Sequence, residues 1–393
     1  MDIFESHYYR INKYLLTYLG QWPYQNPLQK RLIRTLVNCL TVSIIVPEIL
    51  QMIDVWGELD SVIDCVSVIA IQFTNNCKLS NYVFNADKLK GLLTRIRDDW
   101  AADFVGSHLN ILKDYANEGR KLTLIYAVCM YSTLAFYSIM PLMTKVLDFV
   151  MPLNESRPAV NQLPTKYGNV NAEKYYFPIM IHADISSTIA ITTIVAMDTT
   201  YAVYVQHACG IFAALGHRLE NLIGSNDYEG LDQFSAGRQE EVTYRAVVSC
   251  VKMHKDAIEF ADAIESSHVV VFFIVFAMSV FCMSIAGYQM VMNLDKPNEA
   301  IRFAAFTLAQ VAHIFFISWP GQKLIDHSQR IHDYRTRWYL VDDRSKKLLM
   351  IMMLRSVEPC KLTAGKFYVM DLANFSLVVR TSVSYFTMLT SFR

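Results

Sequence analysis

The sequence contains little charge. Only 18% of its 393 residues are charged, whereas 53% are hydrophobic, and the mean hydropathy is +0.22. Soluble domains usually carry about 25% charged residues. The shortage of charge therefore argues against an ordinary soluble domain and indicates a membrane protein.

Other features are also missing, and each absence argues against a class of function. Lys plus Arg and Asp plus Glu both number 36, so no net charge points to nucleic acid as a partner. The motifs GxGxxG, GxxxxGK, HExxH, CxxC and GxSxG do not occur, so the sequence predicts neither an enzyme nor a cofactor. His327 and His332 lie five residues apart and lack the further ligands that a metal site needs.

What the sequence does contain is a series of long apolar runs. Seven runs have about the 20 residues that a helix needs to cross a bilayer, namely 32–53, 62–84, 122–147, 175 to beyond 197, 269–292, 303–319 and 367–392. No solenoid repeat or low-complexity tract accompanies them. We therefore predict an all-α membrane protein with seven transmembrane helices.

The positions of Lys and Arg predict the orientation, because basic residues near span ends stay on the cytoplasmic side. Residues 1–30 contain no recognisable signal peptide, so we expect the amino terminus to be cytoplasmic. In that orientation 28 of the 36 basic residues lie in inside segments and 6 in outside segments. Seven spans then make the carboxyl terminus extracellular. The sequon at Asn154 falls in a predicted outer connection, where glycosylation is expected.

This topology is the reverse of that of G-protein-coupled receptors, whose amino terminus is extracellular. Those receptors also usually have a disulfide in the second outer loop, whereas the long outer connection 148–174 contains no cysteine. The eight cysteines lie mostly in spans or inside segments, where reduced apolar thiols are expected. The sequence therefore argues against that class of receptor.

Four ionisable residues fall inside predicted spans, where each is costly unless it faces a cavity or a partner. His182, Asp184 and Asp198 lie along the fourth span, and Arg380 lies midway along the last one. They predict a polar pocket or an ion path. A later start of the fourth span would instead leave His182 and Asp184 at the membrane interface, and the sequence leaves both interpretations open.

The last span has a narrow stripe of residues at 100° per residue, which comprises Asp371, Asn374, Val378, Thr381, Tyr385, Met388 and Phe392. The stripe is polar at its cytoplasmic end and apolar at its outer end, as in a pore wall that closes at a hydrophobic constriction. Ordinary helix packing gives the same periodicity. A pore would need a ring of subunits, each of which contributes one such helix.

Three spaced motifs occupy the carboxyl-terminal part of the chain. They read G, S, Y, W, then R, P, L, AGK, then SYF, at Gly321, Ser328, Tyr334, Trp338, Arg355, Pro359, Leu362, Ala364, Gly365, Lys366, Ser384, Tyr385 and Phe386. In this order, and with the predicted topology, the chain resembles the insect odorant receptors.

The resemblance implies a ligand-gated, non-selective cation channel that assembles as a tetramer, with the last helix of each subunit lining the pore. Alignment of the terminal motif implies an outer gate at Met388 and Phe392. Both side chains are larger than the aliphatic residues usual in the family, which implies an asymmetric pore. The implied division of the chain is membrane helices one to six with the odorant pocket and cytosolic extensions in 1–320, a cytosolic anchor in 321–365 and the pore helix in 366–393.

The resemblance also implies the kind of subunit and the place of the ligand. The connection between the fourth and fifth spans has no long insertion. In this respect the chain resembles a tuning subunit, which pairs with a co-receptor in the dendrite membrane of a sensory neuron. The odorant is expected in the outer half of the spans, at Ile69, Phe73, Ser132, Ala135, Phe136, Ile139, Ile181, Ile185, Phe303 and Phe306. Ordinary core packing is the alternative interpretation of these residues, since apolar pockets and cores share a composition.

Two other functions remain open at this point. A gustatory-type receptor of the same superfamily would share the channel but bind tastants without a co-receptor. A small-solute transporter would use His182, Asp184 and Asp198 as a proton relay, although the sequence lacks the repeated halves expected of such a protein.

Overall fold

The computed structural model describes residues 2–101, 107–151, 162–222, 233–331 and 341–391. Within these ranges the chain is almost entirely helical. Its elements are a 3₁₀ helix at Ile3–Glu5, α1 (Arg10–Tyr18), α2 (Pro27–Asp54), α3 (Leu59–Phe84), α4 (Ala86–Ala101), α5 (Ser107–Val150), α6 (Tyr176–Glu220), α7 (Gln233–Met292), α8 (Pro297–Gln329), α9 (Asp343–Ser356), β1 (Thr363–Ala364), β2 (Tyr368–Val369) and α10 (Leu372–Ser391).

Local sequence signals set the beginnings of two of these helices. The side chain of Asn26 accepts a hydrogen bond from the Leu28 backbone N–H at 3.0 Å, and Pro27 occupies the first turn of α2. Asp342 accepts hydrogen bonds from the backbone N–H groups of Arg344 and Ser345 at 3.0 and 3.2 Å, which caps α9. These caps satisfy backbone donors that have no partner within the helix.

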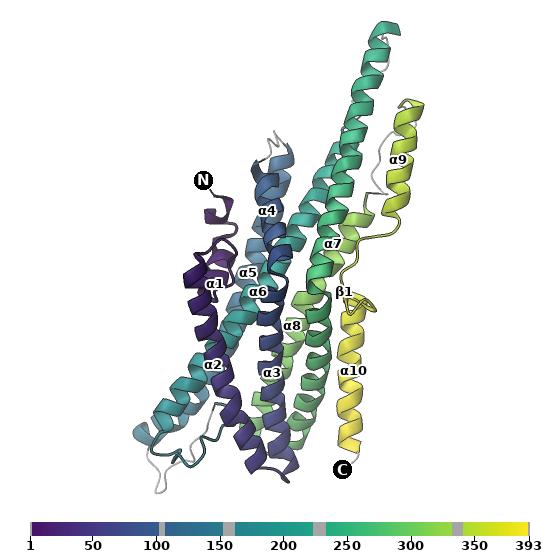
Figure 1. Ribbon diagram of the computed structural model, residues 1–393. Helices are drawn as coiled ribbons and strands as arrows, with labels where there is room; N and C mark the ends of the chain where they lie inside the picture. Colours follow the sequence, from purple (N-terminus) through teal and green to yellow (C-terminus); the bar gives the residue numbers. More distant parts are fainter. Residues whose placement is uncertain (1, 102–106, 152–161, 223–232, 332–340, 392–393) are drawn as a thin grey trace.

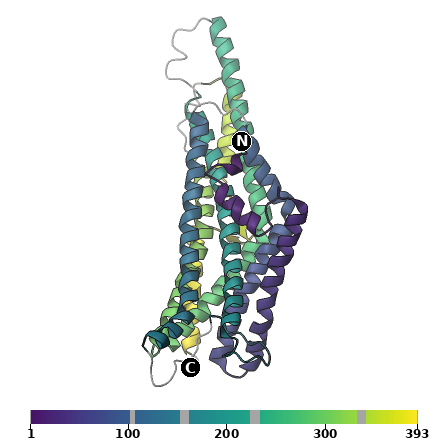
Figure 2. The ribbon, with the colours of Figure 1, turned by 90° about the vertical axis from the view of Figure 1, so that its left-hand side faces the viewer.

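Helix α6 lies at the centre of the bundle. It packs against α1, α2, α3, α5, α7 and α8, and Figures 1 and 2 show it between the other long helices in both views. From Thr192 to Gly216 almost every side chain is buried. A helix that is apolar on all sides is stable in this central position, because every face meets another helix.

Helix α7 extends far beyond the bundle. Its 60 residues correspond to about 90 Å at 1.5 Å per residue, roughly three times the thickness of the hydrocarbon core. Its upper part projects above the other helices in Figure 1, where α9 lies beside it, and the carboxyl terminus lies at the opposite end of the molecule. The projecting part is therefore available for contacts outside a membrane.

A two-stranded hairpin connects α9 to α10. Strands β1 and β2 pair antiparallel, with Ala364 opposite Tyr368, and the turn between them has positive φ at Gly365 and Lys366, both 67°. The Gly365 N–H donates to the carbonyl oxygen of Val269 on α7 at 2.9 Å. The AGK motif thus forms a left-handed turn that attaches the start of α10 to α7, and a side chain at position 365 would be strained.

The first six predicted spans coincide with helices, which confirms the mostly helical architecture, whereas the last one, predicted from residue 367, begins in the hairpin and becomes helical only at Leu372. Among the described residues, five helices are long and apolar enough to cross a membrane, at Pro27–Asp54, His108–Met143, Tyr176–Glu220, Glu240–Met292 and Glu299–Gln329. Helices α3 and α10 are not among them, so a count of seven spans stays a prediction. The predicted division between residues 320 and 321 falls inside α8, which continues to Gln329.

Candidate ligand cavity and pore helix

Asp198, at the middle of α6, is the centre of a buried polar network. Its Oδ1 accepts a hydrogen bond from Lys78 Nζ at 2.5 Å, while its Oδ2 lies 3.0 Å from His313 Nε2 and 3.1 Å from the Tyr126 hydroxyl. None of these four residues is more than 6% exposed. A buried charge is costly unless it is paired and hydrogen-bonded. The network therefore joins α3, α5, α6 and α8 at one level of the bundle.

Sequence reasoning found Asp198 but missed its partners. Lys78 interrupts the second apolar run and His313 interrupts the sixth, so both gave the same signal as Asp198, an ionisable residue within a span. The sequence does not reveal that they pair with Asp198, because Lys78 and His313 are 120 and 115 residues away from it in the chain.

The other ionisable residues singled out in the sequence lie elsewhere. His182 contacts the hydroxyls of Ser43 at 2.9 Å and Tyr167 at 2.6 Å, and Asp184 accepts a hydrogen bond from Ser138 at 2.7 Å. Sixteen residues of helix, about 24 Å, separate His182 from Asp198. The three residues of the hypothetical proton relay are therefore not brought together.

A small cavity adjoins the network. It lies between α3, α6, α7 and α8 and is lined by Ile71, Thr74, Lys78, Ile194, Met278, Ser279, Cys282, Gln310 and His313. A second small cavity shares Lys78 and includes Asp198, Tyr201 and His268 in its wall. Lys78 thus borders both cavities, and apolar side chains with a few polar groups surround the first one, as is usual for small-molecule sites.

The ten residues predicted to bind odorant do not line these two cavities. They lie on α3, α5, α6 and α8, nearer the predicted outer ends of these helices. Ile69, Phe303 and Phe306 are partly buried. The remaining seven side chains are exposed, namely Phe73, Ser132, Ala135, Phe136, Ile139, Ile181 and Ile185. Their role in binding stays a prediction.

The predicted pore stripe begins with two residues that shape the start of α10. Asp371 Oδ1 accepts a hydrogen bond from the Asn374 backbone N–H at 2.7 Å, and the Asn374 side-chain amide donates to the Val369 carbonyl oxygen at 3.0 Å. These bonds cap the helix and connect it to the hairpin.

Further along α10 the stripe moves from the bundle to the surface. Val378 is only 6% exposed and packs in the main hydrophobic core, so it faces its own bundle in this conformation. Thr381 is partly buried, whereas Tyr385 and Met388 are 49% and 48% exposed. Arg380 is exposed and makes no ion pair with the described residues. The outer half of α10 therefore presents a face that another subunit or a pore could meet.

Some predicted residues lie outside the described residues, namely Asn154, His332, Tyr334, Trp338 and Phe392. Within the part of the chain that the structure describes, no group of three or more His, Cys, Asp or Glu side chains could hold a metal ion. All eight cysteines are free thiols.

A comparison with protein families shows which family this chain belongs to. The family model described as 7tm Odorant receptor matches residues 58–383, most of the chain. The chain belongs to this odorant receptor family. Members of the family are receptors or channels rather than enzymes, and the apolar helices described above agree with a transmembrane odorant receptor that acts in olfaction.

Individual relatives of this odorant receptor are distant. Odorant receptor 9a of Drosophila melanogaster is 26% identical over 56% of this chain and 52% of its own, so this chain spans about half the length of that relative. Odorant receptor Or2 of Anopheles gambiae is 22% identical over 94% of this chain and 95% of its own.

The fold is similar to that of a solved insect olfactory receptor. The structure of OR5 from Machilis hrabei in complex with eugenol has a TM-score of 0.79 at 13% identity, over 98% of this chain and 97% of that one. A second structure of the same receptor gives a TM-score of 0.74, also at 13% identity. At this level of identity the likeness is one of fold.

Proposed function

We propose that this odorant receptor is the tuning subunit of an odorant-gated, non-selective cation channel. The observation that carries the proposal is the match of residues 58–383 to the odorant receptor family. The fold adds support, because a receptor of the same fold has been solved in complex with eugenol, a small molecule. A mostly apolar odorant is the expected ligand.

The cavity between α3, α6, α7 and α8 is the proposed odorant site. Ile71, Ile194 and Met278 offer apolar surface, and Gln310 and Ser279 offer hydrogen-bonding groups. A small number of polar groups in an apolar cavity fixes the orientation of a ligand, while the shape of the cavity selects the size of the ligand. Odorant would favour the open channel by binding more tightly to the open than to the closed state.

The proposed channel is a heterotetramer with the odorant co-receptor in the dendrite membrane of a sensory neuron. Seven helices would span the membrane, with α10 lining a central pore and Met388 and Phe392 at its outer gate. Exposed apolar residues on α9 support assembly through the cytosolic part, since Met350, Ile351 and Leu354 are 57%, 65% and 74% exposed. Large exposed apolar patches mark interaction surfaces.

Heterologous expression tests the proposal. Cells that lack other odorant receptors would express this chain with the co-receptor or alone, with surface labelling of the chain in both cases. The expected result is odorant-evoked cation current only in the co-expressing cells. Current from this chain alone would indicate a receptor that works without the co-receptor, and absence of any odorant-evoked current despite surface expression would contradict the proposal.

A further inference from the structure

A second polar network lies at the predicted outer ends of α3, α7 and α8. We call it the outer network, and its residues are Asp64, Gln289 and Arg302. Asp64 Oδ1 accepts a hydrogen bond from Gln289 Nε2 at 3.0 Å, and Asp64 Oδ2 lies 3.7 Å from a guanidinium nitrogen of Arg302. One carboxylate therefore joins three helices at this level of the bundle.

The outer network lies on the same faces of these helices as the proposed odorant cavity. Residues seven or eleven positions apart on a helix return to nearly the same face, because each residue turns the helix by 100°. Each residue of the outer network is separated in this way from a residue that lines the cavity, in the pairs Asp64 and Ile71, Gln289 and Cys282, and Arg302 and His313. The outer network therefore lies above the cavity, about 10 Å further out along α3 and α7.

Cys282 lies between the outer network and the rest of the cavity. Its side chain lines the cavity and is 2% exposed, and its Sγ is 4.0 Å from the carbonyl oxygen of Ser67. Ser67 is about one turn inward of Asp64 on α3. A molecule that moves into the cavity along these faces from the extracellular side would therefore pass the outer network first and Cys282 next.

Charged side chains join α3 to α8 at both ends of the cavity. At the inner end Lys78 Nζ lies 3.2 Å from His313 Nε2, within the buried network of Asp198. At the outer end the side chains of Arg302 and Asp64 are 26% and 32% exposed. Exposed ion pairs contribute little to stability, whereas breaking a buried pair is costly. The outer pair is therefore the one that can open.

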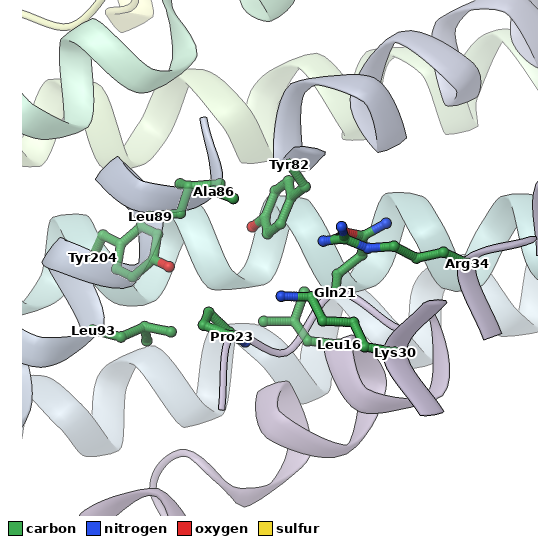
Figure 3. A pocket seen from close by; sticks show the side chains of 10 residues that line it. All are labelled: Leu16, Gln21, Pro23, Lys30, Arg34, Tyr82, Ala86, Leu89, Leu93 and Tyr204. Atoms are coloured by element: carbon green, nitrogen blue, oxygen red, sulfur yellow. The ribbon is translucent and has the colours of Figure 1, made fainter. Parts of the chain in front are cut away.

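Toward the cytoplasm large side chains fill the bundle. Tyr82 lies one turn beyond Lys78 on α3 and is 5% exposed, and Tyr204 on α6 is 0% exposed. Figure 3 shows both beside a small cavity whose wall also comes from α1, α2 and α4. These elements cover the inner parts of α3 and α6, which favours an approach to the odorant cavity from the outer end.

We propose that the ion pair between Asp64 and Arg302 is a gate on an extracellular route by which odorant enters the cavity between α3, α6, α7 and α8. The cavity is small in this conformation, so a ligand must separate α3 from α8, and the pair opposes that separation. Opening of the pair admits the ligand, and closure retains it. The inference rests on the proposed function for the identity of the ligand, but the route can be tested without odorant.

Thiol labelling of Cys282 tests the route. Intact cells that co-express the co-receptor would be treated from outside with a membrane-impermeant quaternary ammonium methanethiosulfonate, and mass spectrometry of the Cys282 peptide would give the labelling rate. Asp64→Asn and Arg302→Gln each break the pair, so each should raise the rate about threefold to fivefold, the value of one exposed ion pair. Because the reagent is cationic, a mere change in local charge would shift the two rates in opposite directions. Opposite shifts, or unchanged rates in both variants, would refute the gate.

Two matched controls separate opening of the gate from other effects. Glu299 pairs with the same Arg302 at 2.9 Å but lies on the same helix, so Glu299→Gln should change the labelling rate less than about twofold. Cys65 is 1% exposed and follows Asp64 directly, about 100° around α3, so its own labelling should stay slow in every variant. Faster labelling of Cys65 together with Cys282 would indicate general loosening of the outer end and would overturn the proposal.

Reversal of the pair provides a rescue variant. The double change Asp64→Arg, Arg302→Asp restores opposite charges between α3 and α8, so it should return the Cys282 labelling rate to within about twofold of that of the unmodified receptor. A double variant that is labelled as fast as either single variant would contradict the role of the pair as the gate. Rescue in a receptor that gives no odorant-evoked current would support the gate and contradict the proposed ligand instead.

Discussion

Removing Asp198 from its network should destabilise the receptor strongly. The carboxylate contacts Lys78 at 2.5 Å, His313 at 3.0 Å and Tyr126 at 3.1 Å, and all four residues are buried. In Asp198→Leu the Lys78 ammonium keeps its burial but loses its counter-ion. Breaking a buried pair in this way costs about 3–5 kcal/mol. We expect a loss of this size in the free energy of unfolding.

The double variant Lys78→Met, Asp198→Leu separates the loss of a pair from the loss of packing. Because it removes both charges, it should recover most of the stability that Asp198→Leu loses. Thermal unfolding in detergent can be followed with a thiol-reactive fluorophore, since Cys209, Cys250 and Cys282 are buried until the chain unfolds. If Asp198→Leu unfolds at the temperature of the unmodified chain, or if the double variant is no more stable than Asp198→Leu, the network does not hold the bundle as described.

Three further predictions concern the carboxyl-terminal part of the receptor. An added Cβ at Gly321 would overlap the Met370 carbonyl oxygen, so Gly321→Ala should cost about 1–3 kcal/mol of unfolding free energy in the same assay. Gly91→Ala, where nothing lies within 4 Å of an added Cβ, is the control. Burial raises the pKa of the Cys360 thiol to about 11, so at pH 7.4 it stays protonated, and mass spectrometry should find it unlabelled by maleimide until the chain unfolds. Met388→Ser should raise leak current through the co-expressed channel, and unaltered conduction would contradict the proposed register of α10.

The sequence predicted the long helices because length and apolarity are local properties. It missed α1 and α4, which are short and amphipathic. In α4 the buried residues Leu89, Leu92, Leu93 and Ile96 follow helical spacing, but a search for long apolar runs passes over such a pattern. The predicted spans also stopped at polar sequence, whereas α7 continues as a helix far into it. Backbone hydrogen bonds do not depend on side-chain polarity.

The candidate site was harder to predict because it depends on helix rotation and on pairing between distant segments. Phe73 and Thr74 are adjacent in α3, yet Phe73 is 52% exposed and Thr74 lines the cavity. A single apolar run does not reveal which of its faces meets other helices. The pairing of Asp198 with Lys78 and His313 likewise needed the packed bundle.

The most direct test of the account compares the odorant response of two variants at these adjacent positions. Among the described residues, the Thr74 hydroxyl donates to the Ala70 carbonyl oxygen of its own helix, at 2.8 Å, and to no other helix, so Thr74→Leu fills the cavity without breaking a hydrogen bond between them. In cells that co-express the co-receptor, Thr74→Leu should raise the half-maximal odorant concentration about tenfold, in line with a steric cost of 1–3 kcal/mol, while Phe73→Leu leaves it within about twofold of the unmodified receptor. The reverse pattern would contradict the placement of the odorant between α3, α6, α7 and α8.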